Sequence, residues 1–173
     1  MKPNNRIPSH LLSLAGEHRV ASELCKLGVF ASVTPGNRKQ TDIYAINDST
    51  KRFVRIEVKA SQTRRFVTGI GQKKTRKSYS PPDFWVLVLF DHERERFFVL
   101  ENSEIEKLQD ERNKKWLEGF QLRNPGAVFN PRDGVDGLSL EDVEQQNCEG
   151  SWKKIVDCVG GIERAANLAA VEK

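Results

Sequence analysis

Two short stretches of the sequence carry charged residues where buried strands are expected. FVRIEVKASQ (53–62) contains Glu57 and Lys59, and TDIYAI (41–46), one hairpin earlier, contains Asp42. Because side chains alternate between the faces of a strand, Glu57 and Lys59 point the same way, roughly 7 Å apart. A short turn between the two strands would bring Asp42 near Glu57. We therefore expect two carboxylates and one ammonium group to gather at one place.

These residue types suit the hydrolysis of a phosphodiester. Paired carboxylates offer the oxygen ligands that Mg²⁺ prefers, and such an ion polarises a phosphoryl group and lowers the pKa of a bound water. A nearby lysine can hold the attacking water or neutralise charge on the phosphate. Glu57 is the only acid in the chain that is followed two residues later by a lysine. The alternative is a solvated sheet face with a weak ion pair worth under about 1 kcal/mol, which the flanking apolar residues disfavour.

A further acid, Glu17, lies in a predicted helix over residues 9–27. Apolar residues recur there at helical spacing, with Ser9 as the expected N-cap and Gly28 as the stop. Glu17 borders the apolar stripe, where a carboxylate costs desolvation unless it meets a cation or a metal. An exposed helix carboxylate is the other interpretation.

The elements that position these residues predict a mixed α/β domain. After the helix, three strands joined by tight turns form an antiparallel meander over residues 29–34, 41–46 and 53–58. Residues 63–77 are expected to form a loop. A central strand buried on both faces, a further strand and a helix capped by Ser103 follow over residues 85–90, 97–100 and 102–117. Beyond Gly119 we expect loop, two short helices and a terminal helix.

The four charged residues and their elements resemble the PD-(D/E)xK nuclease superfamily, which includes Holliday junction resolvases, many restriction enzymes and some homing endonucleases. The resemblance is carried by GEHRVASELCKLGVFASVTPGNRKQTDIYAI and RFVRIEVKASQ. It is close over roughly residues 9–62 and loose over the strands near 85–100. Thr41 stands where the motif has its proline, a position that shapes the strand entry and carries no chemistry.

This resemblance implies a restriction-endonuclease-like α/β core, with a mixed central sheet flanked by helices, of the Holliday junction resolvase and homing endonuclease branch. Residues 1–118 would form the nuclease-like core. Residues 119–173 would be a C-terminal extension of the same domain, without a counterpart that we can align. The activity implied is that of a metal-dependent DNA endonuclease.

The resemblance also implies roles for the site residues. Mg²⁺, for which Mn²⁺ would substitute, would be held by Asp42, Glu57, the backbone carbonyl of Val58, and Glu17. Lys59 would orient or activate the attacking water, and Gln62 would be an accessory contact beyond the strand.

Basic residues cluster next to the predicted site and are expected to hold the DNA backbone. Each one that meets a phosphate would add nearly one unit to the salt dependence of binding. A solvated loop is the alternative, which the position beside the acids disfavours. The predicted DNA-binding residues are Arg38, Lys39, Arg64, Arg65, Lys73, Lys74, Arg76 and Lys77.

The bulk composition fits one soluble domain. The net charge is +4, from 28 Lys and Arg against 24 Asp and Glu, which does not by itself establish a polyanionic partner. The longest apolar run has seven residues, whereas a membrane-spanning helix needs about 20. No secretory signal, metal-ligand cysteine spacing or glycine-rich nucleotide loop is recognisable, so we expect a cytoplasmic protein without membrane attachment or a nucleotide cofactor.

Other functions are compatible with the same sequence. A catalytically silent nuclease-like module could bind nucleic acid or a protein without cutting, although all four site residues are present. A scaffold whose C-terminal extension binds another protein is a third hypothesis. A duplex has two strands to cut, whereas the chain carries one predicted site. A homodimer is therefore a possible arrangement.

Overall fold

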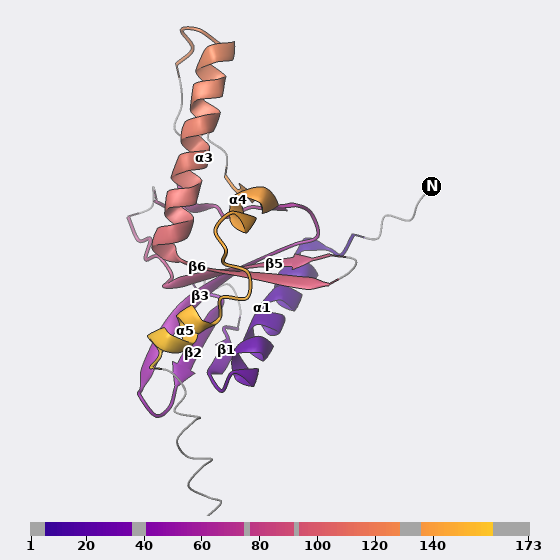
Figure 1. The fold of residues 1–173 in the computed structure, drawn as a ribbon, viewed down its shortest axis with the longest axis vertical. Helices are drawn as coiled ribbons and strands as arrows, with labels where there is room; N and C mark the ends of the chain where they lie inside the picture. Colours follow the sequence, from indigo (N-terminus) through magenta and orange to yellow (C-terminus); the bar gives the residue numbers. More distant parts are fainter. Residues whose placement is uncertain (1–5, 36–40, 75–76, 92–93, 129–135, 161–173) are drawn as a thin grey trace, which may run out of the picture.

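The framework of the protein is a five-stranded mixed sheet with the order β1-β2-β3-β5-β6 (Figure 1). The computed structural model describes residues 6–35, 41–74, 77–91, 94–128 and 136–160. The sheet strands are β1 (Phe30–Val33), β2 (Ile43–Asn47), β3 (Arg52–Ser61), β5 (Phe84–Phe90) and β6 (Glu95–Glu101). The first three form the predicted antiparallel meander, β3 runs parallel to β5, and β5 runs antiparallel to β6.

Helices cover both faces of this sheet, which confirms the predicted class, α/β with a mixed central sheet flanked by helices. One face carries α1 (Ser9–Lys26) and α5 (Lys153–Cys158). The other face carries α2 (Ile70–Lys74), α3 (Asn102–Arg123), α4 (Leu140–Glu144) and a ribbon formed by β4 (Arg65–Phe66) and β7 (Leu138–Ser139). Helix α3 extends well beyond the edge of the sheet (Figure 1).

Strand β5 separates the two halves of the core. Alternate residues beginning with Phe84 pack toward α1 and α5, and those beginning with Trp85 pack toward α3 and α4. Every residue of β5 except Phe90 is buried. This confirms the predicted central strand, because only a strand covered on both faces has use for a continuous apolar run.

Residues after the long helix take part in the same core. Helix α3 continues unbroken past residue 118, and its end at Arg123 lies beyond the predicted end. Leu138 and Val143 pack in the cluster of α3, whereas Ile155 packs with α1. The terminal helix predicted from residue 163 lies outside the described residues. No helix of the described part of the chain is long and apolar enough to cross a membrane.

The predicted helix caps are wrong in two places. Ser9 is the first residue of α1, and Pro8, whose ring fixes a compatible backbone angle, occupies the cap. At α3 the cap is Glu101 rather than Ser103, and the Glu104 carboxylate accepts a hydrogen bond of 2.8 Å from the Glu101 backbone N–H. Gly28 does end the first helix, with a φ of 77°. The predicted loop over residues 63–77 instead contains β4 and α2.

Candidate active site

Close packing of α1 on β3 places Glu17 near the end of the strand. A Cβ added to Gly16 would lie 2.8 Å from the Ala60 Cβ, so a side chain there would push the helix away from the sheet. Glu17 follows directly and is half-buried. Burial raises the pKa of Glu17, the charges of Asp42 and Glu57 raise it further, and the Lys59 charge opposes them. The helix therefore brings a third carboxylate into the field of the two predicted ones.

Asp42 is held against β3 where the β2 ladder stops. The last ladder pair joins Ile43 to Ile56, and the Asp42 backbone N–H donates to the Ile56 carbonyl at 3.0 Å. The Val58 backbone N–H then donates to Asp42 Oδ2 at 2.7 Å, in place of a further strand bond. Burial raises the pKa of Asp42 and the negative charge of Glu57 adds to this, which outweighs the Val58 hydrogen bond and the lysines.

Glu57 is buried, with 5% of the residue exposed, and is paired with two lysines. Its Oε1 atom accepts from Lys59 Nζ at 2.6 Å and from Lys73 Nζ at 2.5 Å. Burial opposes the charge of Glu57, but the two ammonium groups outweigh it, and the pKa of this carboxyl lies below its ordinary value. Glu57 and Lys59 therefore lie on one face of β3, as predicted, and form an ion pair to which Lys73 adds a second cation.

The second cation, Lys73, is positioned by α2. Ile70 buries this short helix in the core, and the Thr68 hydroxyl donates to Gln109 Oε1 of α3 at 3.0 Å in a buried contact. The Lys73 ammonium also lies 4.8 Å from the centre of the Trp85 ring, the neighbour of Glu57 on β5. The sequence assigned Lys73 to DNA contact. Nothing in the residue spacing indicated its contact with Glu57, which is made across 16 positions by the fold of α2.

The four predicted site residues therefore share one end of β3, but they do not form a closed coordination shell. Among the described residues, no group of three or more His, Cys, Asp or Glu side chains is arranged to hold a metal ion. The donor set is chemically suited to Mg²⁺, because it consists of carboxylate oxygens, two of which belong to groups whose pKa is raised.

The Val58 carbonyl is a further oxygen at this place. The N–H and C=O groups of one residue point to the same side of an extended strand. Because the Val58 N–H points to Asp42, we expect its carbonyl to face the same side, beyond the start of β2.

The other predicted residues that the structure describes either have partners outside the cluster or are exposed. Gln62 accepts a hydrogen bond from the Ile7 backbone N–H at 2.9 Å. Arg64 pairs with Glu141 at 2.9 Å and Lys74 with Glu106 at 3.3 Å. Arg65 and Lys77 are exposed. Arg38, Lys39 and Arg76 lie outside the described residues.

Tyr79 is a residue that the sequence did not single out. Its hydroxyl is buried and has no hydrogen-bond partner among the described residues. Burial raises the pKa of Tyr79, and the charges of Glu106 and Glu57 add to the effect. The phenol thus lies in the field of Glu57, one acid of the cluster, and neither periodicity nor spacing in the sequence could have indicated this.

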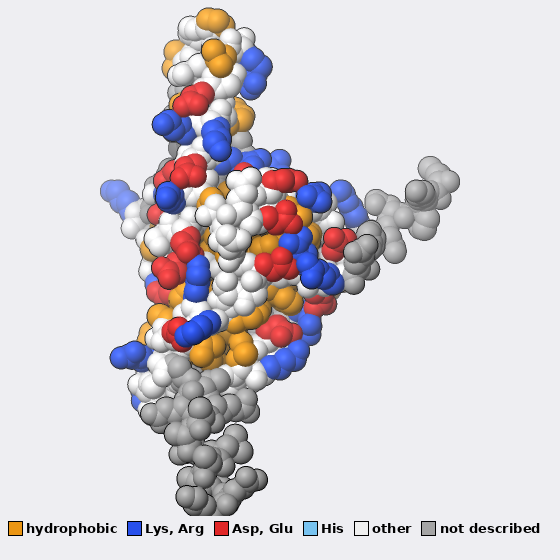
Figure 2. All heavy atoms as spheres, viewed as in Figure 1, with side chains coloured by type: hydrophobic (Ala, Val, Ile, Leu, Met, Phe, Trp, Pro, Cys, Tyr) orange, Lys and Arg blue, Asp and Glu red, His pale blue; other side chains and the backbone are white. Residues whose placement is uncertain are grey.

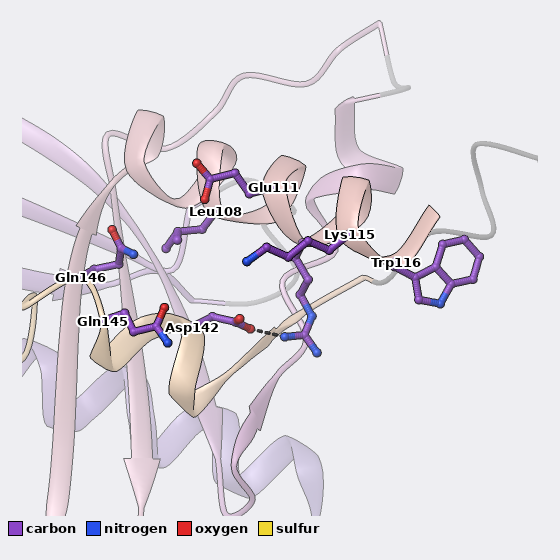
Figure 3. A pocket seen from close by; sticks show the side chains of 8 residues that line it. Leu108, Glu111, Lys115, Trp116, Asp142, Gln145 and Gln146 are labelled. Atoms are coloured by element: carbon purple, nitrogen blue, oxygen red, sulfur yellow. Dashed lines mark hydrogen bonds and ion pairs between the residues drawn. The ribbon is translucent and has the colours of Figure 1, made fainter. Parts of the chain in front are cut away.

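A separate pocket lies between α3 and α4 (Figure 3). It has a volume of about 310 Å³, and Arg112 and Asp142 form an ion pair in its wall. None of its lining residues belongs to the cluster at the end of β3. On the face shown in Figure 2, acidic and basic side chains are interspersed over the surface.

No family model and no curated protein sequence matches the chain. Among solved structures, the chain is similar to the bacterial homing endonuclease I-Ssp6803I, with a TM-score of 0.37 and 17% sequence identity. The similarity covers 56% of this chain and 70% of that one. A likeness at this level says nothing about the function of this chain. The function has to be inferred from the residues of the site.

Proposed function

We propose that the protein is a metal-dependent DNA endonuclease that hydrolyses phosphodiester bonds at the end of β3. The observation that carries the proposal is the Asp42 carboxylate, which accepts a hydrogen bond from the Val58 N–H and lies in the field of buried Glu57 and its partner Lys59. Two carboxylates of this cluster have a raised pKa, so they are held together at an electrostatic cost. Clusters of that kind are typical of functional sites.

The metal would be held by Asp42, Glu57, the Val58 carbonyl and Glu17. When bound, such an ion supplies Lewis-acid polarisation of a phosphate and a more acidic water. Lys59 has the right position for a second function, because its ammonium group is partly exposed and tethered to Glu57 at 2.6 Å. From there it can donate hydrogen bonds to a phosphate oxygen or orient the attacking water. Exposed Arg65 and Lys77 would contact the DNA backbone.

Cleavage of a labelled substrate panel tests the proposal. The panel contains linear duplex, supercoiled plasmid, a four-way junction, a flap and a single strand, each with Mg²⁺, with Mn²⁺ and with chelator. We expect metal-dependent cutting that Lys59→Ala removes while DNA binding remains. Loss of binding together with cutting would assign Lys59 a structural role.

The plasmid in the same panel reports on stoichiometry. One chain carries one proposed site and would nick a single strand, so conversion directly to linear DNA would indicate two copies acting together. Nicked circles alone would favour a single acting copy.

A catalytically silent nucleic-acid-binding or protein-interaction module is the second candidate. The observation that favours it is the engagement of Glu57 by two lysines, which leaves no closed group of acids among the described residues. This function predicts DNA binding without cutting under every metal tested. Cutting that survives in the chelator would contradict both candidates.

A further inference from the structure

Glu57 has one more cation than the proposed chemistry requires. Lys59 and Lys73 both donate to the same atom, Oε1, at 2.6 and 2.5 Å. A carboxylate oxygen offers about two acceptor positions, so these two ammonium groups fill Oε1. The side chains are largely shielded, with exposed fractions of 18% for Lys73 and 7% for Glu57. Salt therefore screens their attraction less than that of a surface pair.

The position of Lys73 is built into the fold rather than chosen by a flexible side chain alone. Gly69 precedes α2 with a φ of 68°, and the Lys73 backbone N–H donates to the Gly69 carbonyl at 3.0 Å. Ile70 and Thr68 anchor this turn in the core and on α3. The ring of Trp85 then supports the ammonium from below at 4.8 Å, a favourable cation–π distance.

We propose that Lys73 is an internal counter-ion of the site, which occupies Glu57 in place of the divalent cation and is displaced when that cation binds. This rests on the proposed function, because it names what regulates metal entry at the same residues. A divalent ion and an ammonium group on one carboxylate oxygen repel each other, and the repulsion is strong where water is excluded. Once displaced, the ammonium stays on α2 beside the site, where a substrate phosphate would be its next partner.

The neighbouring lysine provides a matched control. Lys74 carries the same charge on the same helix, but it pairs with Glu106 at 3.3 Å and with Asp110 at 3.6 Å. Lys73→Met and Lys74→Met therefore remove the same charge from the protein, and only the first removes a partner of Glu57, which keeps its hydrogen bond from Lys59. Lys73→Gln, which can still donate a hydrogen bond to Glu57 without a charge, serves if the methionine variant does not fold.

Binding of Mn²⁺, measured as the free ion by electron paramagnetic resonance, is the first readout. We expect Lys73→Met to bind about tenfold more tightly than the wild type, which corresponds to about 1.4 kcal/mol. Lys74→Met should differ little from the wild type. Equal affinities of the two variants would overturn the proposal, since charge removal alone would then explain any gain.

Emission of Trp85 is the second readout, in a background where Trp116 and Trp152 are replaced by Phe. Addition of Mg²⁺ should change this emission when Lys73 leaves the ring, and Lys73→Met should abolish the change. The same change in both proteins would contradict displacement.

The outcomes also separate this inference from the proposed function. If the wild type, Lys73→Met and Lys74→Met all fail to bind Mn²⁺, the proposed metal-dependent function is wrong and this inference is wrong with it. If Lys73→Met and Lys74→Met bind Mn²⁺ with equal affinities, only the role assigned to Lys73 is wrong.

Discussion

In two partly buried ionic clusters on this chain, burial raises the pKa of an aspartate, but the partners of the two aspartates lead to opposite net shifts. At the edge of the pocket between α3 and α4, Asp142 Oδ2 accepts hydrogen bonds of 2.7 Å from the Ser139 N–H and hydroxyl and pairs with Arg112. Burial opposes its charge, but these partners outweigh burial and the pKa of Asp142 is lowered. At the end of β3, burial and like charges raise the pKa of Asp42 and of Glu17.

The difference separates a cluster whose charge stabilises the fold from one whose charges oppose folding. Asp142 completes the capping box of α4 with the N-cap residue Ser139 and joins this helix to α3, so its negative charge has enough partners and favours folding. Asp42 shares its surroundings with two other carboxylates, and its ionisation opposes folding. Carboxylates whose pKa is shifted in this way cluster at functional sites, which supports the proposed function.

The largest expected effect is on cleavage by variants that remove one cation from each cluster. Under the proposed function, Lys59→Ala should lower the single-turnover rate by about 10²–10⁴-fold, because its ammonium group would act on the reacting groups. Arg112→Ala should leave the rate per folded molecule close to that of the wild type while it lowers stability. Equal losses of rate in both variants would remove the distinction between the clusters.

Stability at neutral pH should change in opposite directions when each aspartate becomes asparagine. Asp142→Asn should lower the free energy of unfolding by about 1–3 kcal/mol, because charge-assisted bonds to Ser139 and Arg112 are lost. Asp42→Asn removes an unfavourable charge and keeps an acceptor for Val58, so stability should stay level or rise by about 0.5 kcal/mol. Urea unfolding measures both, and a large loss in Asp42→Asn would show that its charge stabilises the fold.

The pH dependence of these differences sharpens the test. The pKa of Asp42 is raised from its ordinary value of 3.8. The destabilisation of the fold by its negative charge is therefore absent below pH 3.8 and complete above the folded-state pKa. The advantage of Asp42→Asn should therefore appear as the pH rises through that window. The pKa of Asp142 is lowered from 3.8, so its contribution is full above pH 3.8 and is lost as the pH falls through the folded-state pKa. Unfolding series between about pH 3 and pH 8 would reveal both trends, and parallel curves would refute the assignment.

The smallest expected effect concerns two adjacent arginines near the two clusters. Arg64 is paired with Glu141 of α4, whereas exposed Arg65 has no ion pair within the part of the chain that the structure describes. Arg65→Ala should reduce the salt slope of DNA binding by about one unit, and Arg64→Ala should reduce it less. Binding isotherms at several salt concentrations provide the comparison, and a larger change for Arg64 would place the DNA on the α4 side.

The sequence predicted that the residues at the end of β3 lie close together because their positions follow from the two-residue period of a strand and the 3.6-residue period of a helix. Strand alternation placed Glu57 and Lys59 on one face, and the hairpin set Asp42 beside them. The helical stripe placed Glu17 at the border of the core.

Contacts between elements that are far apart in the sequence could not be predicted, because strand and helix periodicity determines only which face of its own element a residue occupies. Lys73 reaches Glu57 from α2, a helix that buried Ile70 and the Thr68–Gln109 hydrogen bond across 41 positions hold in place. The Arg112–Asp142 pair likewise joins residues 30 positions apart. The cap of α3 was mistaken because several polar residues occur at its start and only the backbone geometry selects Glu101, and the cap of α1 was mistaken because Pro8, which has no polar side chain, occupies it.

Binding of Mn²⁺ to the wild type, Asp42→Asn and Asp142→Asn tests the central claim most directly. If the end of β3 is the metal site, the wild type and Asp142→Asn bind one ion with the same affinity, and Asp42→Asn loses it. Equal binding by all three proteins, or loss in Asp142→Asn alone, would contradict the assignment of the site.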